Sequence, residues 1–78
     1  MHTNAAPFHP ETLVGNTFYR LQATDLFSDD WPLTFDHLVL EVHAVLRDVW
    51  GWPETAGTAK RARGIATVIA RHVAISEG

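Results

Sequence analysis

One run of apolar residues constrains this chain more than any other feature. Its members are spaced three, four, three and four residues apart, which is the period of a helix. They are Phe35, Leu38, Val42, Val45 and Val49. Val39 and Leu46 widen the run into a stripe that can face a core. Because the apolar residues do not alternate cleanly, the pattern favours a helix over a strand.

Both ends of this helix carry terminal signals. The Thr34 hydroxyl can cap the first turn, and Asp36 within that turn suits the positive end of the helix dipole. Gly51 can take the left-handed conformation that ends a helix, and Pro53 prevents continuation. The sequence therefore predicts a helix that begins after Thr34 and ends before Gly51.

A second helix is predicted from about Thr58 to Ile75. Its buried face is expected to hold Ala62, Ile65, Ala66, Ile69 and Val73. Two starts remain open. With Thr58 as the cap, two cations lie in the first turn, where the dipole disfavours each by about 0.3–1 kcal/mol. With a start at Pro53, Gly57 becomes interior and costs about 1 kcal/mol.

The segment from Pro10 to Ala23 fits two interpretations, a helix and a hairpin. Pro10 fits the first helical position and Glu11 the positive end of the dipole. The apolar residues on one helical face are Leu13, Val14, Phe18 and Leu21. In the alternative, Gly15-Asn16 is a hairpin turn followed by a strand. We expect a helix here.

These elements define the expected fold. Residues 1–9 have no periodic pattern and are expected to form a flexible arm, anchored by Phe8, while residues 10–78 form one helical domain. Leu26, Phe27 and Trp31 make the connector too apolar to be freely solvated, so it should pack on the domain. We therefore predict an all-α, compact three-helix arrangement with an ordered apolar connector. The alternative is an α+β fold with a short N-terminal hairpin.

Composition narrows the class of protein. The 78 residues include no Cys, which excludes disulfides and is typical of a cytoplasmic protein. The beginning of the chain has neither the basic nor the apolar region of a secretory signal, and the longest apolar stretch, residues 64–70, is far short of a membrane span. We expect a cytoplasmic protein without membrane association.

Charge is divided unevenly along the chain. Residues 1–55 hold eight acids and two bases, a net charge of −6, whereas residues 56–78 hold four bases and one acid, a net charge of +3. Either the acidic and basic parts neutralise each other within one molecule, or they form faces for a partner.

Catalytic and metal-binding patterns are weak. With no Cys, and with Ser28 and Ser76 outside any tight-turn context, no nucleophile is indicated. His37 and Glu41 lie four residues apart on one helical face, but no third ligand converges with them. We therefore expect no enzymatic activity, no bound metal and no cofactor. His43 can still act as a pH switch if it is half-buried.

Two neighbouring features indicate a binding surface. Trp50 and Trp52 flank Gly51, and Trp is enriched at the energetic centres of interfaces. A basic cluster follows. The candidate partner-binding residues are Trp50, Trp52, Lys60, Arg61 and Arg63.

The most consistent function is that of a small non-enzymatic regulator, inhibitor or adaptor that acts by protein–protein interaction, and self-association is compatible with it. One alternative is a helix-turn-helix-like DNA-binding regulator that uses the AKRAR segment at residues 59–63. The net charge of −3 argues against nucleic acid. A second alternative is a metal-binding or histidine-switched small protein.

Overall fold

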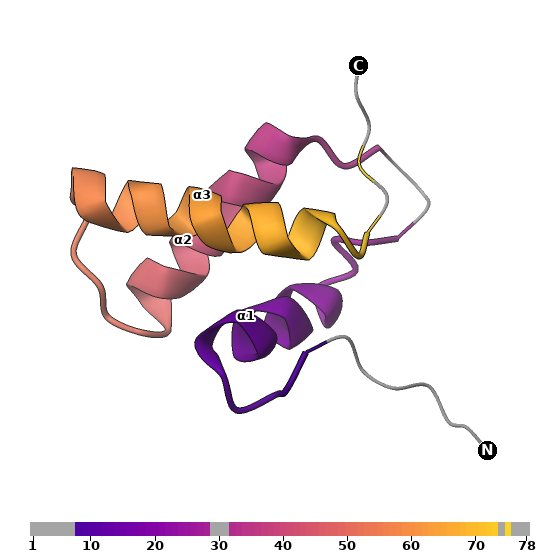
Figure 1. Ribbon diagram of the computed structural model, residues 1–78, viewed down its shortest axis with the longest axis horizontal. Coiled ribbons are helices and arrows are strands. Elements are labelled where there is room, and N and C mark those ends of the chain that lie inside the picture. The colour runs from indigo at the N-terminus through magenta and orange to yellow at the C-terminus, as the bar shows by residue number, and fades with distance from the viewer. Residues whose placement is uncertain (1–7, 29–31, 74, 76–78) are drawn as a thin grey trace.

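The computed structural model describes residues 8–28, 32–73 and 75. Its helices are α1 (Leu13–Gln22), α2 (Phe35–Asp48) and α3 (Ala56–Ala70). α3 crosses α2 in the most extensive helix–helix contact, and α1 packs against both (Figure 1). The all-α three-helix arrangement is confirmed. The alternative hairpin at residues 15–16 is wrong, because both residues lie inside α1. None of the described helices is long and apolar enough to cross a membrane.

A threonine caps the beginning of each helix. The hydroxyls of Thr12, Thr34 and Thr55 each accept a hydrogen bond from the backbone amide three residues further along, at 3.0, 3.1 and 3.2 Å. Amides in a first helical turn have no partner within the helix, so a capping hydroxyl satisfies one of them. The prediction for Thr34 is confirmed.

The other two helices begin at residues different from those predicted. Pro10 is not the first helical residue, because a turn precedes α1 in which the Thr12 amide and hydroxyl both donate to the His9 carbonyl, at 3.2 and 2.8 Å. α3 begins at Ala56, between the two predicted starts, because Thr55 rather than Thr58 is the cap.

The end of α3 also differs from the prediction. The helix stops at Ala70 rather than near Ile75. There the backbone hydrogen bonds span three residues instead of four. The Arg71 amide donates to the Val68 carbonyl at 3.3 Å, and the His72 amide donates to the Ile69 carbonyl at 2.9 Å. These tighter bonds close the last turn and satisfy carbonyls that the helix leaves free.

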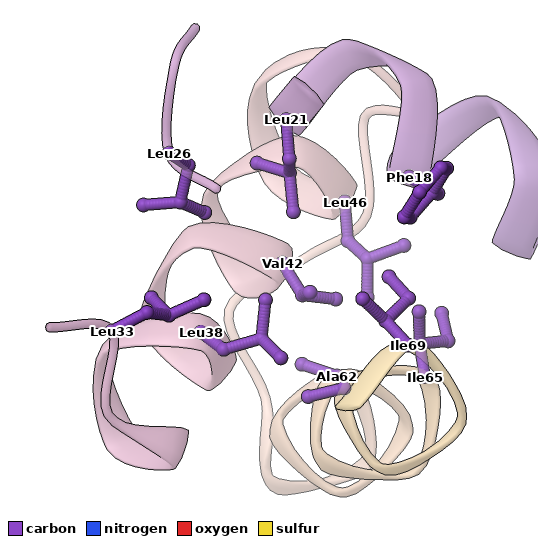
Figure 2. Close-up of a cluster of buried hydrophobic side chains, with 11 residues drawn as sticks. Phe18, Leu21, Leu26, Leu33, Leu38, Val42, Leu46, Ala62, Ile65 and Ile69 are labelled. Atoms are coloured by element: carbon purple, nitrogen blue, oxygen red, sulfur yellow. The ribbon is translucent and has the colours of Figure 1, made fainter. Parts of the chain in front are cut away.

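All three helices and the connector contribute to one apolar core (Figure 2). Its buried members are Phe18, Leu21, Leu26, Leu33, Leu38, Val42, Leu46, Ala62, Ile65, Ala66 and Ile69. The centre of the predicted α2 stripe is fully buried. Val49, the cap residue that follows the last helical residue of α2, is 46% exposed.

The connector and the N-terminal segment pack on this core. Leu26 is buried, and the Phe27 ring stacks on Phe18 with 5.4 Å between centroids. Trp31, which was predicted to pack as well, lies outside the described residues, as do residues 1–7 of the predicted arm. The ring of Phe8 lies 5.0 Å from that of Phe18, and the Tyr19 hydroxyl donates to the Phe8 carbonyl at 3.1 Å. Phe8 thus anchors the segment that precedes α1.

Candidate interaction surface

The turn between α2 and α3, residues 49–55, holds both candidate tryptophans. We refer to it as the tryptophan turn. Gly51 has φ 73°, a left-handed conformation, as the sequence predicted. Beyond it the Trp52 amide donates to the Leu46 carbonyl at 2.9 Å, which satisfies one of the last carbonyls of α2. Glycine without a Cβ adopts this conformation at little cost, so the chain reverses tightly here.

The two tryptophans have different environments. Trp52 is half-buried and packs against the core. Trp50 is 41% exposed, and the adjacent Val49 is exposed to a similar extent. Val49 and Trp50 therefore form the most exposed apolar surface at this end of the molecule, whereas Trp52 places part of its side chain against the core.

The three cations of the candidate site do not form a single patch. Lys60, Arg61 and Arg63 are all exposed on α3. At about 100° per residue, Arg61 and Arg63 leave opposite flanks of the helix, with Lys60 between them and pointing away from the core. The Arg63 guanidinium lies over the Phe35 ring, 5.5 Å from its centroid, in a cation–π contact with the start of α2. Lys60 and Arg61 remain exposed without such a contact, about 100° apart around the helix.

Three acids in and near α2 have partners other than these cations. Arg47 contacts Asp48 at 2.9 Å and Glu54 at 3.0 Å, and His37 contacts Glu41 at 3.3 Å. Within residues 8–28, 32–73 and 75, no cation of α3 forms an ion pair. The idea that the basic cluster neutralises the acids of α2 therefore receives no support from the described part of the chain.

The Arg47 pairs have an electrostatic consequence. The hydrogen bonds from Arg47 hold the pKa of the Asp48 carboxyl below its ordinary value of 3.8. Reciprocally, the hydrogen bonds to Asp48 and then Glu54 raise the pKa of Arg47. The cluster ties the end of α2 to the tryptophan turn through charged groups that are exposed to solvent.

A groove runs between α1 and α2, with a volume of about 360 Å³. We call it the α1–α2 groove. It is lined by Arg20, Leu21, Ala23, Thr24, Glu41, Ala44, Val45, Asp48 and Val49. Charged side chains stand at its rim, and Arg20 among them is held by a 2.7 Å hydrogen bond from its Nε to the Asn16 side chain. Sequence reasoning missed this site, and its only signal was the position of Val49 at the exposed end of the apolar stripe.

The histidines give little indication of a binding site. The described residues contain no group of three or more His, Cys, Asp or Glu that could hold a metal ion. His43 is half-buried, and its Nε2 is buried without a hydrogen-bond partner among those residues. His72 contacts the Phe8 ring edge-on, with 4.9 Å between centroids.

No model of a protein family, no curated protein and no solved structure matches this chain. The functional argument therefore depends on the geometry described above.

Proposed function

We propose that this chain is a small non-enzymatic protein that acts by binding another protein, as a regulator, inhibitor or adaptor. The observation that carries the proposal is the exposed pair Val49 and Trp50 at the end of α2. Val49 and Trp50 are consecutive and both exposed, and tryptophan is enriched at the energetic centres of protein interfaces.

The charges near this surface support the same function. Lys60 and Arg61 follow the tryptophan turn within the first two turns of α3, and neither forms an ion pair with a described residue. Unpaired cations on the helix that follows an apolar anchor attract an acidic partner and fix its orientation, while the anchor supplies most of the affinity.

Affinity capture from the native cell tests the proposal. Trp50→Ala removes the anchor, and Leu40→Ala is the matched control, because Leu40 is 66% exposed on the face of α2 that points away from the core. We expect the wild type and Leu40→Ala to capture the same protein and Trp50→Ala to lose it. The purified pair should lose about 2 kcal/mol of binding free energy, roughly 30-fold in Kd. If both variants capture the protein equally and both keep the wild-type melting temperature, Trp50 is not part of the interface.

DNA binding is the second candidate, because unpaired cations on α3 suit phosphates as well as carboxylates. Against it, the turn of residues 49–55 is longer than the three or four residues usual in helix-turn-helix proteins. A gel-shift assay over a range of salt concentrations separates the two functions. We expect no sequence-specific binding at physiological salt, and a steeply salt-dependent nanomolar complex would favour DNA.

A further inference from the structure

The α1–α2 groove and the exposed Trp50 are complementary features of one chain. We propose that the partner is a second copy of this protein, with Trp50 of each copy seated in the α1–α2 groove of the other about a two-fold axis. This inference rests on the proposed function and names the partner of the same surface.

The size and lining of the groove suit one large apolar side chain. Its volume of about 360 Å³ lies at the lower end of the range for binding pockets, about 300–1,000 Å³, and is too small for a whole helix. Leu21, Ala44, Val45 and Val49 contribute its apolar lining. Trp50 has the largest exposed apolar side chain at that end of the described structure. An aromatic side chain of this kind buries about 150–250 Å².

The positions of anchor and groove fit a closed dimer. Val49 lines the groove, and Trp50 follows it directly, so their Cα atoms are about 3.8 Å apart. A two-fold interface uses the same patch on both subunits, and each contact occurs twice. Because the anchor directly follows a lining residue of the groove, two copies can exchange anchors reciprocally. An anchor remote from its groove would instead link copies head to tail into an open chain.

Charge complementarity also favours a second copy. Glu41 and Asp48 line the groove together with one cation, Arg20, so its lining is negatively charged on balance. Lys60 and Arg61 lie in the first two turns of α3 without ion pairs among the described residues. The current partners of the two acids are His37 and Arg47, in solvent-exposed pairs that contribute little to stability. Both carboxylates can therefore accept Lys60 and Arg61 of the second copy when Trp50 enters the groove.

Sedimentation equilibrium of the untagged full chain tests this dimer. We expect a monomer–dimer equilibrium that weakens as salt concentration rises, because exposed ion pairs are screened. Trp50→Ala should weaken dimerisation at least about ten-fold, and Leu40→Ala should leave it unchanged. If the wild type stays monomeric up to about 1 mM at low salt, any dimerisation is weaker than a specific association of use in a cell. This result would overturn the proposal.

A charge exchange tests the reciprocal contact. Glu41→Lys with Asp48→Lys makes the groove basic, and Lys60→Glu with Arg61→Glu makes α3 acidic, so each double variant alone should be monomeric. Mixed together, the two variants should form a heterodimer, because opposite charges then face each other at both contacts. A mixture that remains monomeric, with both variants folded by circular dichroism, would overturn this arrangement.

The outcomes also separate this inference from the proposed function. A wild type that is monomeric but captures a different protein through Trp50 would eliminate the second copy as the partner and leave the proposed function standing. A wild type that neither dimerises nor captures any protein would eliminate both.

Discussion

Gly15 in α1 and Gly64 in α3 lie inside helices in opposite surroundings. Gly15 is buried, and a Cβ at this position would overlap the backbone carbonyl of His9, which packs across α1. Gly64 is exposed, and a Cβ there would meet nothing within 4 Å. The same substitution, glycine to alanine, should therefore change the free energy of unfolding in opposite directions at the two sites.

The expected magnitudes follow from helix propensity and packing. Alanine in a helix interior is more favourable than glycine by roughly 0.5–1 kcal/mol, and Gly64→Ala should gain this amount. At Gly15 the gain is outweighed, because the obstructing atoms belong to the backbone and cannot rotate away. Overpacking costs about 1–3 kcal/mol, and displacing His9 also disturbs the turn that positions the Thr12 cap. We expect Gly15→Ala to destabilise the fold by about 1–3 kcal/mol overall.

Thermal unfolding followed by circular dichroism measures both effects. In a domain of this size, 1 kcal/mol corresponds to about 4–8 °C in Tm. Gly64→Ala should raise the Tm by about 2–8 °C, and Gly15→Ala should lower it by about 4 °C or more. If Gly15→Ala were as stabilising as Gly64→Ala, the His9 carbonyl would not lie against α1, and our explanation for the start of that helix would be wrong.

Three further changes test the core, a cap and the charged cluster. Val42 is fully buried, so Val42→Asp should cost about 3–5 kcal/mol by placing an unpaired charge in the core, and an unchanged Tm would contradict the assigned face of α2. Thr55→Ala should cost about 1 kcal/mol in urea unfolding, because it removes the cap of α3. Since Arg47 lowers the pKa of Asp48, the stability from this pair is present above pH 3.8 and is lost as the pH falls through the lower folded value. Arg47→Ala should therefore show a smaller loss of stability than the wild type when acidified below pH 3.8, measured by urea unfolding at each pH.

The sequence alone determined the features that depend on neighbouring residues. The boundaries of α2 were predictable, because its apolar period, its Thr34 cap and the Gly51 reversal are all local signals. The all-α fold followed from that period and from the Ala/Ile face of α3. The predicted partner-binding residues follow from residue type and position, and the structure places four of them at the surface: Trp50, Lys60, Arg61 and Arg63. The fifth, Trp52, is half-buried against the core.

Tertiary packing decided what the local pattern left open. α1 begins at Leu13 because Thr12 is its cap, and the Thr12 hydroxyl is held by the His9 carbonyl, which lies against the helix. No propensity of Pro10 or Glu11 reveals that contact. Likewise, only the packing of α2 against α3 brings the Phe35 ring under the Arg63 guanidinium. The α1–α2 groove is lined by segments about twenty residues apart, and its shape depends on how closely two helices approach and which side chains fill the space between them. Helix periodicity predicts which face of each helix is buried. A groove is the space that remains between helices after they have packed, so it can be found only in the assembled structure.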